Sequence, residues 1–375
     1  MKKETQCVHT GTYHDSGTRG VNTPVFTSSA YEYLDRGDIP YPRYFNTPNQ
    51  AAVVEKLCAL EGGEDGILFS SGMAAITTTV LAFAGSGDHV VMLDALYGGT
   101  HAFVTDTFDR LGIGYAFTAT EAGAVKQAVT PATKVIVIES PTNPLLAVLD
   151  VREVARFARE RGILTVMDNT FATPVNQSPL AMGIDVAVHS GTKYLGGHSD
   201  LCCGAAITSR ELAGRILTMA RHLGGSLNAM TCYLLERSLK TLALRVARQT
   251  ENAGLVAGFL AGHGAVGRVN YPGLPDFKGH AIAASQMSGF GAMLSFELDE
   301  GRVRAGDFLR RLKLIRPAVS LGGVDTIICA PCETSHAKMS AEERRRIGVS
   351  DALLRLSVGI EHVEDIVEDL SQALG

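Results

Sequence analysis

The chain has 375 residues, of which 46% are hydrophobic and 19% are charged, and its formal net charge is −5. This length predicts two or three domains with a large buried core, and the composition excludes an intrinsically disordered chain. The weak negative charge offers no basic field to nucleic acid or anionic lipid, and no apolar run reaches the roughly 18 residues of a membrane span. We therefore expect a globular protein that acts on small molecules, without nucleic-acid or membrane partners.

The N-terminus and the cysteines indicate the compartment. The first ten residues, MKKETQCVHT, contain no apolar core of a secretory signal. The cysteine count is seven, and an odd number fits reduced thiols better than a disulfide framework. Cys329 and Cys332 form a lone C-x-x-C motif without a second ligand pair at zinc spacing, so no metal site is expected. We expect a cytoplasmic protein.

In chain order, an irregular arm comes first and an alternating pattern follows. Residues 1–48 are rich in Thr, Ser, Pro, Tyr and Gly and show no helical period. From residue 49 amphipathic helices alternate with short apolar strands. The predicted helices cover residues 50–62, 72–83, 99–112 and 150–162. The predicted strands cover residues 66–71, 88–94, 133–140, 162–170 and 185–190.

This alternation is typical of an α/β domain. Apolar strands that alternate with helices indicate parallel βαβ units and a mostly parallel sheet covered on both faces, which we expect over residues 49–242. After a helical stretch at about 226–262 the pattern changes. Strands are predicted at 266–274, 291–298 and 353–360, with a last helix at 363–374. We therefore expect a smaller α+β domain over residues 243–375.

Polar residues gather at four of the predicted strand ends. FSSGM (69–73) is a strand, a tight turn and a helix start, where free N–H groups and the helix dipole suit a phosphate. In sheets of this kind, ligands bind at the carboxyl ends of the strands. The other three strand ends are ESPTNP (139–144), VMDNTF (166–171) and HSGTK (189–193).

Together these ends supply what pyridoxal phosphate needs. Lys193 can form a Schiff base, Asp168 can pair with the pyridinium nitrogen, and the turn around Ser71 can hold the phosphate. A carboxylate at the end of an apolar strand is costly unless it has a charged partner. Alone, Lys193 could be a surface lysine and Ser71 a simple N-cap. Their combination favours a cofactor site.

Two other motifs indicate different chemistry. GHGAVG (262–267) matches a dinucleotide fingerprint, but it follows a predicted helix and precedes a strand, so a helix C-cap and turn is favoured. Ser190 and Lys193 form the S-x-x-K signature of penicillin-binding proteins, whereas the S-D-N and K-T-G tripeptides of that chemistry are missing from the sequence. An acyl enzyme and a non-catalytic scaffold remain rival hypotheses.

The motifs together resemble the Cys/Met-metabolism (trans-sulfuration) family of fold-type I pyridoxal-phosphate enzymes. This group includes cystathionine β- and γ-lyases, cystathionine γ-synthase, methionine γ-lyase and O-acylhomoserine sulfhydrylases. The resemblance implies the fold-type I architecture. The collinear motifs begin with YPRYFNTPN at 41, LEGGEDGILFSSGMAAI at 60, DALYGGT at 94 and ESPTNP at 139, and continue with DNTFATP at 168, HSGTKYLGGHSD at 189, AVSLGGVDT at 318 and LLRLSVGIE at 353.

The resemblance also implies roles for individual residues at the cofactor. Lys193 would hold the cofactor and later act as acid and base, and Asp168 would pair with the ring nitrogen. Tyr97 would stack on the ring and assist proton transfer. The phosphate would be held by Ser71, Gly72, Met73, Ser190 and Thr192.

Further roles fall on the substrate and on a neighbouring subunit. Asn143, Ser320 and Arg355 would bind the substrate α-carboxylate, for which an arginine fork is well suited. Tyr41 and Arg43 would reach the cofactor phosphate of a neighbouring subunit, and Tyr41 also the substrate. The resemblance therefore implies a homodimer with shared active sites, and a homotetramer built from two such dimers.

The implied activity is C–S bond cleavage in methionine and cysteine metabolism. A β- or γ-elimination from cystathionine or a related thioether or thiol amino acid would give a 2-oxo acid, ammonia and a thiol. The alternative is γ-replacement, as in cystathionine γ-synthase or an O-acylhomoserine sulfhydrylase, and methionine γ-lyase ranks third. The physiological substrate and the choice between β- and γ-chemistry stay open.

Three positions depart from specialised members of the family. Pro40 and Val319 are apolar where enzymes that act on cystathionine at Cγ often carry an acidic residue, so the distal end of the substrate has no obvious anchor. Gly99 stands where methionine γ-lyases usually place a cysteine, which argues against methionine cleavage. His101 and His336 lie near site motifs, and a structural or rim position is favoured for both.

Overall fold

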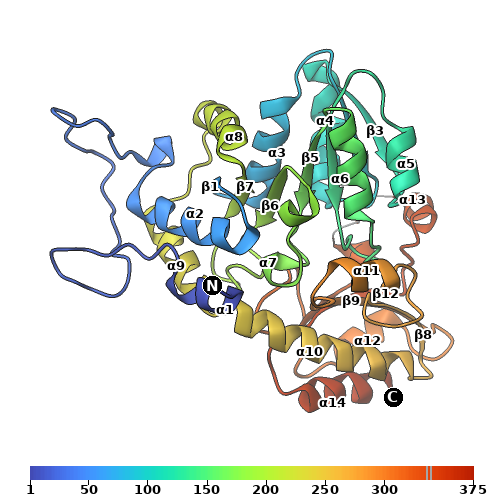
Figure 1. Cartoon of the computed structure of the whole chain (residues 1–375). Helices are drawn as coiled ribbons and strands as arrows, with labels where there is room; N and C mark the ends of the chain where they lie inside the picture. Colours follow the sequence, from blue (N-terminus) through green and yellow to red (C-terminus); the bar gives the residue numbers. More distant parts are fainter. Residues whose placement is uncertain (335–336, 338–339) are drawn as a thin grey trace.

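The structure, a computed structural model, describes residues 1–334, 337 and 340–375 (Figure 1). The α-helices are α1 (Lys3–His9), α2 (Pro48–Glu61), α3 (Gly72–Phe83), α4 (Gly98–Leu111), α5 (Ala122–Gln127), α6 (Val151–Glu160), α7 (Thr173–Asn176), α8 (Arg210–Leu223), α9 (Ala229–Leu239), α10 (Leu242–Ala261), α11 (His280–Gln286), α12 (Ala305–Arg311), α13 (Ala341–Arg346) and α14 (Val363–Leu374). No helix among these described residues is long and apolar enough to cross a membrane.

Two sheets organise the chain. The first has the order β1-β7-β6-β5-β4-β2-β3 and the second the order β10-β11-β12-β9-β8. The strands are β1 (Asp65–Phe69), β2 (His89–Leu93), β3 (Gly114–Thr118), β4 (Thr133–Glu139), β5 (Leu164–Asp168), β6 (Val186–Ser190), β7 (Gly204–Thr208), β8 (Val266–Asn270), β9 (Met293–Leu298), β10 (Arg316–Pro317), β11 (Ile327–Cys329) and β12 (Leu353–Ser357).

The first sheet is mostly parallel, as predicted. Within it only the pairings of β7 with β1 and with β6 are antiparallel. Side chains alternate across β1: Ile67 and Phe69 pack with residues of α3, whereas Leu68 packs with residues of α2. Helices therefore cover both faces, and the strands between them are almost entirely apolar.

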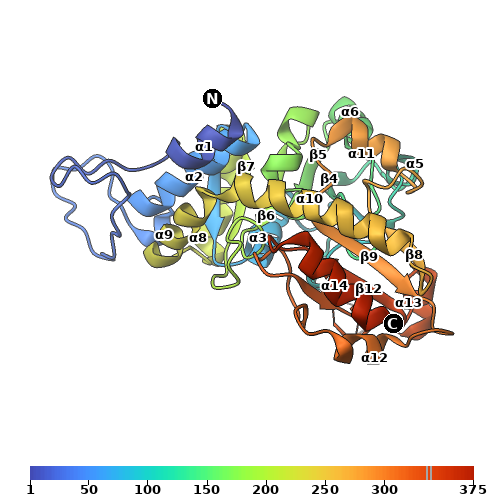
Figure 2. The same cartoon turned by 90° about the horizontal axis from the view of Figure 1, so that it is seen from below.

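The second sheet is mainly antiparallel and forms a smaller layer with α10, α12 and α14 (Figure 2). The predicted boundary between residues 242 and 243 falls at the first turn of α10. This long helix packs against β8 and β9 and also against α1. The division into three segments at 48 and 242 stays a prediction.

Several predicted elements needed correction. The arm is not wholly irregular, because Lys3–His9 forms α1; only Cys7 of this helix is buried, so no apolar stripe marks it in the sequence. The helical stretch at 226–262 is two helices, which meet at a turn where Thr241 donates to the Ser238 carbonyl. Strand β7 consists mostly of small residues and was not predicted. GHGAVG is a helix C-cap and turn between α10 and β8, as expected.

Candidate active site

A cavity of about 420 Å³ lies at the carboxyl ends of β4, β5 and β6 and against the second sheet. It brings together all predicted site residues except Tyr41 and Arg43. Its lining comprises Ser71, Gly72, Met73, Ile76, Tyr97, Thr100, Glu139, Asn143, Asp168, Thr170, Phe171, Ser190, Thr192, Lys193, Cys202, Val319, Ser320, Leu321, Thr334 and Arg355.

Lys193 follows β6 and extends into this cavity. Its Nζ donates to Ser320 Oγ at 2.9 Å. Burial, and next the positive charge of Arg355, lower the pKa of Lys193 below its ordinary value. The lysine is therefore more easily present as a neutral amine than an exposed lysine would be, as a nucleophile or a base requires.

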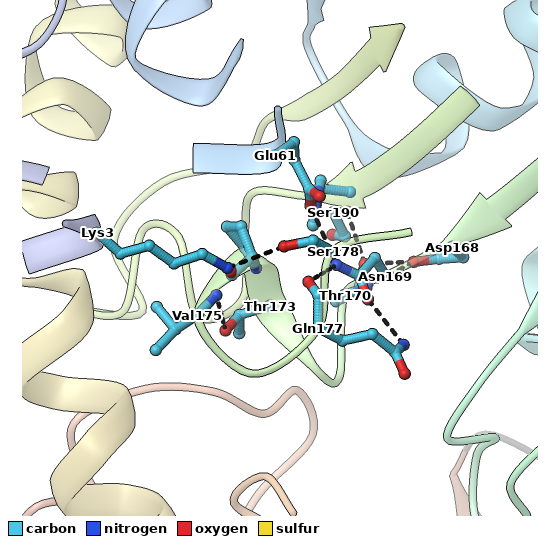
Figure 3. Close-up of polar contacts among 12 residues, drawn as sticks. Lys3, Glu61, Asp168, Asn169, Thr170, Thr173, Val175, Gln177, Ser178 and Ser190 are labelled. Carbon is cyan, nitrogen blue, oxygen red and sulfur yellow. Dashed lines mark hydrogen bonds and ion pairs between the residues drawn. The ribbon is translucent and has the colours of Figure 1, made fainter. Parts of the chain in front are cut away.

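Asp168 is the last residue of β5, and both of its hydrogen bonds go to one oxygen (Figure 3). Oδ1 accepts from Thr170 Oγ1 at 2.6 Å and from the Thr170 N–H at 3.0 Å. Thr170 Oγ1 accepts in turn from the Ser190 N–H at 2.8 Å, which ties the ends of β5 and β6 together. Burial raises the pKa of Asp168, and none of the described residues donates to Oδ2. A cation in the cavity can pair with this oxygen and offset that cost.

A buried polar cluster lies behind Asp168 (Figure 3). Glu61, the last residue of α2, accepts at Oε1 from Asn169 Nδ2 at 3.0 Å, and His189 Nε2 lies 2.5 Å from the same oxygen. Gln177 Nε2 donates to Asn169 Oδ1 at 3.1 Å and to the Ser140 carbonyl at 2.9 Å. These bonds fix the backbone at the ends of β5 and β6. Asp168 is the last residue of β5, and the loop that carries Lys193 follows β6.

The turn before α3 has the form of an anion cradle. Ser71 is the N-cap, and its hydroxyl accepts from the Ala74 N–H at 3.0 Å. A Cβ on Gly72 would lie 2.7 Å from Ser190 Cβ and 2.9 Å from Ser190 Cα, so this close approach requires glycine. The first N–H groups of a helix have no partner within it, and those of Gly72 and Met73 lie at the cavity wall. Thr192 was also predicted to hold the phosphate, but in the structure its hydroxyl is hydrogen-bonded to the backbone N–H and carbonyl of Cys203.

Tyr97 lies at the mouth of the cavity, with its side chain 48% exposed. It is the N-cap of α4 and makes no side-chain capping bond. A Cβ on Gly99 would lie 2.6 Å from Tyr97 Cε1 and 3.0 Å from Met73 Sδ. The observed ring position therefore depends on glycine at residue 99.

The second sheet contributes the cationic wall. Arg355, in the middle of β12, is 5% exposed, and it donates through Nη1 to Asn143 Oδ1 at 3.0 Å and through Nη2 to the Ser320 carbonyl at 3.1 Å. Ser320 has φ of +85°, an unfavourable conformation for a residue with a side chain. Ser320 thus contacts Lys193 through its hydroxyl and Arg355 through its carbonyl, which joins the two sheets at the cavity.

Glu139 and Thr170 are the main lining residues without a predicted role. Glu139 is 5% exposed at the end of β4, where it pairs in register with Asp168. The sequence marked Glu139 as a polar strand end but gave it no partner. Thr170 could have been found from its position two residues after Asp168, a spacing typical of an Asx-type turn.

The two arm residues lie elsewhere in the molecule. Tyr41 and Arg43 are exposed, and Arg43 Nη2 donates to the carbonyl of Arg221 in α8 at 2.7 Å. The arm runs away from the body of the chain (Figure 1). Their predicted contact with a neighbouring subunit stays a prediction.

The residues for which no catalytic or metal-binding role was predicted are His101, His336, Cys329 and Cys332. His101 stacks on Phe117 at 4.4 Å between ring centroids and does not line the cavity, as its structural interpretation requires. His336 lies outside the described residues. Cys329 and Cys332 are free thiols, and the described part of the chain holds no group of three or more potential His, Cys, Asp or Glu ligands.

Comparison with known proteins identifies the family. The model of the Cys/Met metabolism PLP-dependent enzymes matches residues 4–375. The chain belongs to this family. The predicted enzyme class and the pyridoxal-phosphate cofactor are therefore confirmed. The cavity fits that cofactor, since Asp168 has an oxygen free for the ring nitrogen, and Lys193 lines the same cavity as the helix start at Gly72, where a Cβ would clash with Ser190.

Relatives with different activities are almost equally similar to the chain. A cystathionine γ-lyase of Bacillus subtilis is 43% identical over 100% of this chain and 99% of its own length. A cystathionine β-lyase of the same organism and a cystathionine γ-synthase of Mycobacterium tuberculosis are each 42% identical over 99% of this chain and 96% of their own. The crystal structure of cystathionine γ-lyase from Lactobacillus plantarum complexed with L-serine has a TM-score of 0.96 at 37% identity and covers 100% of this chain and 98% of that one. The fold-type I prediction is confirmed.

Proposed function

We propose that this protein is a C–S lyase that cleaves cystathionine or a related thioether amino acid into a thiol, ammonia and a 2-oxo acid. The observation that carries the proposal is the placement of Lys193, an amine of lowered pKa, in one cavity with Asp168 and Arg355. Lyases of both regiochemistries are among the relatives, which supports the reaction class.

The cofactor would be held by residues of the first sheet. Lys193 would bind its carbonyl carbon covalently, Asp168 Oδ2 would pair with its ring nitrogen, and the turn at Ser71 and Gly72 would take its phosphate. Pyridoxal phosphate, when bound, supplies an electron sink for the pair released from the substrate Cα–H bond. The rigid bonds of Thr170 to Asp168 keep the carboxylate aligned for this role.

Proton transfer would fall to Lys193. As a neutral amine its Nζ can take the proton from the substrate Cα and return one to the departing sulfur or to the carbon skeleton. The hydrogen bond to Ser320 Oγ keeps Nζ on the side of the cavity that faces Arg355. Tyr97 would close the opposite side and limit the access of water.

The α-carboxylate of the substrate would bind to Arg355. Nη1 and Nη2 each use one of their N–H groups within the protein, which leaves one N–H on each nitrogen for a bidentate pair with a carboxylate. Asn143 and Ser320 orient the guanidinium from both ends. This pair fixes the Cα–H bond of the substrate relative to Lys193.

The residues at the rim of the cavity would influence which amino acids the enzyme accepts as substrates. Val319 lines the cavity with 71% of its surface exposed, and Pro40 is part of the arm outside it. An apolar rim at Val319 offers no charge to a distal amino group, which favours broad acceptance of thioether and thiol amino acids. We also propose that the active unit is a homodimer in which Tyr41 and Arg43 complete the neighbour's site, that two dimers form a tetramer, and that the protein is cytoplasmic.

A second candidate is γ-replacement, because the cystathionine γ-synthase of M. tuberculosis is as similar as the β-lyase. The synthase reaction would need the same Lys193 and Arg355 and an O-acylhomoserine in place of the thioether.

The test is an absorption spectrum of the purified protein followed by L-cystathionine in the same cuvette, with the products identified by mass. An absorption band at about 420 nm is expected for the loaded enzyme. Pyruvate with homocysteine would establish β-elimination, and 2-oxobutyrate with cysteine would establish γ-elimination. A band without either product, and turnover of O-acylhomoserine with a thiol, would establish the second candidate. A protein that binds no pyridoxal phosphate would overturn the proposal.

A further inference from the structure

Glu139 is a buried carboxyl group that no step above uses. It is the last residue of β4, lines the active-site cavity and is 5% exposed. Its register partner on β5 is Asp168, so the two carboxyl groups are neighbours on one face of the sheet. No described lysine, arginine or histidine forms an ion pair with Glu139. A group in so costly a position requires a reason.

The clearest contact of Glu139 is with the backbone of Tyr97. Its Oε2 accepts the Tyr97 N–H at 3.0 Å. Tyr97 is the N-cap of α4, and its own side chain makes no capping bond. In a capping box the N–H of the N-cap residue is bonded by a glutamate of the same helix. Here a glutamate from a neighbouring strand makes that bond instead, and it ties the N-cap residue of α4 to the end of β4.

The position of the Tyr97 ring is set from two directions. On one side the ring lies against Gly99, where an added Cβ would come within 2.6 Å of Tyr97 Cε1 and 3.0 Å of Met73 Sδ. From the backbone side, the bond to Glu139 fixes where the Cα of Tyr97 lies. A shift of that Cα would move a ring that is half exposed and has few other restraints.

We propose that Glu139 is a positioning residue that holds Tyr97 over the cofactor through the Tyr97 N–H, and that it acts as a hydrogen-bond acceptor rather than as a charge. The proposal rests on the cofactor site proposed above and extends it to a residue outside the predicted set. Glu139 itself would not touch the reacting atoms.

The surroundings of Glu139 favour the uncharged form. Burial, and next the negative charge of Asp168, raise the pKa of Glu139 well above its ordinary value. The N–H groups of Tyr97 and Asn143 and the charge of Arg355 oppose this shift but are smaller. Asp168 has two hydrogen bonds from Thr170 and is the carboxyl group better suited to carry the charge. Glutamine, which resembles a protonated glutamate in shape, is therefore the conservative substitute at residue 139.

Two substitutions test separately the hydrogen-bond acceptor of Glu139 and its ability to carry a negative charge. Glu139→Gln keeps the length of the side chain and an acceptor oxygen but carries no charge. Glu139→Asp keeps an ionisable carboxyl group, but the side chain is shorter by about 1.5 Å, which lengthens a 3.0 Å bond beyond hydrogen-bonding range. Tyr97→Ala defines the signal that is lost when the ring is absent.

The measurement is visible circular dichroism per bound cofactor, together with the cofactor dissociation constant of the apoprotein. Dichroism in the cofactor band depends on the orientation of the ring relative to its neighbours, and a loss of general stability does not alter it while the protein stays folded. The control is Asp150→Ala, which removes the N-cap of α6, whose side chain accepts the Glu153 N–H at 2.9 Å outside the cavity. This control should lower Tm and leave the dichroism unchanged.

The proposal expects Glu139→Gln to match the wild type. It expects Glu139→Asp to shift the dichroism toward that of Tyr97→Ala and to weaken cofactor binding about tenfold, as for one lost hydrogen bond. The reverse order, with Gln impaired and Asp intact, would overturn it in favour of a charge. Unchanged dichroism in Tyr97→Ala or in Glu139→Asp would also overturn it. If Glu139→Asp does not fold, Glu139→Gln still decides, since any loss in that variant contradicts the proposal. A wild type without a cofactor band would defeat the proposed function instead.

Discussion

The active-site cavity and the N-terminal arm both carry residues expected at the cofactor. The fold brings those of the cavity close together and leaves those of the arm exposed at the surface. In the cavity, Lys193, Asp168 and Arg355 come from two sheets and are held within one chain. In the arm, Tyr41 and Arg43 lie at the surface, and Arg43 donates a hydrogen bond to the Arg221 carbonyl. The arm also exposes Tyr33, Leu34 and Tyr44, large apolar side chains that a monomer gains nothing from exposing.

This difference indicates which part of the cofactor site a single chain can form by itself. Buried strand ends are fixed by the sheet, so their side chains converge without help from another molecule. The arm has few buried contacts of its own between α1 and α2, so its position near a cofactor requires a surface from elsewhere. We expect substitutions in the cavity to act within each chain and substitutions in the arm to act across chains.

The largest effect is expected for Lys193→Ala. Activity should fall by more than about 1,000-fold because both the covalent link to the cofactor and the base are lost. The visible band of the bound cofactor should change with it, which an absorption spectrum detects. Lys134→Ala, at an exposed lysine of β4, is the matched control and should leave both unchanged. Full activity in Lys193→Ala would sink the assignment of the site.

The arm is tested by mixing two inactive variants. Arg43→Glu should weaken cofactor binding about 100-fold, because it places an anion where a phosphate is expected. Subunits of Arg43→Glu and Lys193→Ala that exchange at random should recover about a quarter of wild-type activity, since half of the dimers contain one intact site. No recovery after proven subunit exchange would show that the arm acts within its own chain.

Arg355→Lys tests the wall that the second sheet contributes. Lysine keeps the charge but cannot form a bidentate pair, so KM for the amino acid should rise about 10- to 100-fold with a smaller change in kcat. Arg316→Lys, at an exposed position in β10 of the same sheet, is the control for a general effect of this exchange. Steady-state kinetics with cystathionine measures both constants. Equal loss in the two variants would argue against a carboxylate site at Arg355.

The pH dependence of cofactor uptake tests the electrostatic link between the two sheets. The pKa of Lys193 is lowered by burial and next by Arg355, so its neutral form is populated at lower pH than in a free lysine. The rate at which the apoprotein takes up pyridoxal phosphate should rise with pH through this lowered pKa. Arg355→Met removes one of the two causes, so the inflection should move to higher pH. An unmoved inflection would mean that burial alone sets the pKa.

The smallest effect is expected at the cavity mouth. Gly99→Ala places a Cβ 2.6 Å from the original position of Tyr97 Cε1, so the ring must move. A loss of activity of about threefold is expected from a displaced ring that still covers the site. Gly123→Ala, in α5, is the control, because an added Cβ there meets nothing within 4 Å. An unchanged rate and unchanged cofactor dichroism would show that the ring position is not critical.

Local patterns in the sequence predicted candidate cofactor residues that the structure brings together in one cavity, but they did not predict some elements at the edges of the fold. Asp168 and Ser190 could be singled out because each ends a run whose length and branching indicate a buried strand, and Lys193 because it comes three residues after Ser190 in a Gly/Thr turn. Strand β7 could not, because GAAIT is short and its antiparallel place beside β1 depends on a partner some 140 positions earlier in the chain. Helix α1 could not either, since it packs on α10 with one buried residue.

The sequence by itself indicated the family, the cofactor and a set of polar strand ends as candidate site residues, because motifs and apolar periodicity are local properties of the chain. Only the tertiary structure decided how they work together. It placed the hydroxyl of Ser320 on Lys193 and its carbonyl on Arg355, and it set Glu139 beside Asp168 and under the backbone of Tyr97. Such contacts join residues far apart in the chain, and their distances follow from how two sheets pack, which no local pattern encodes.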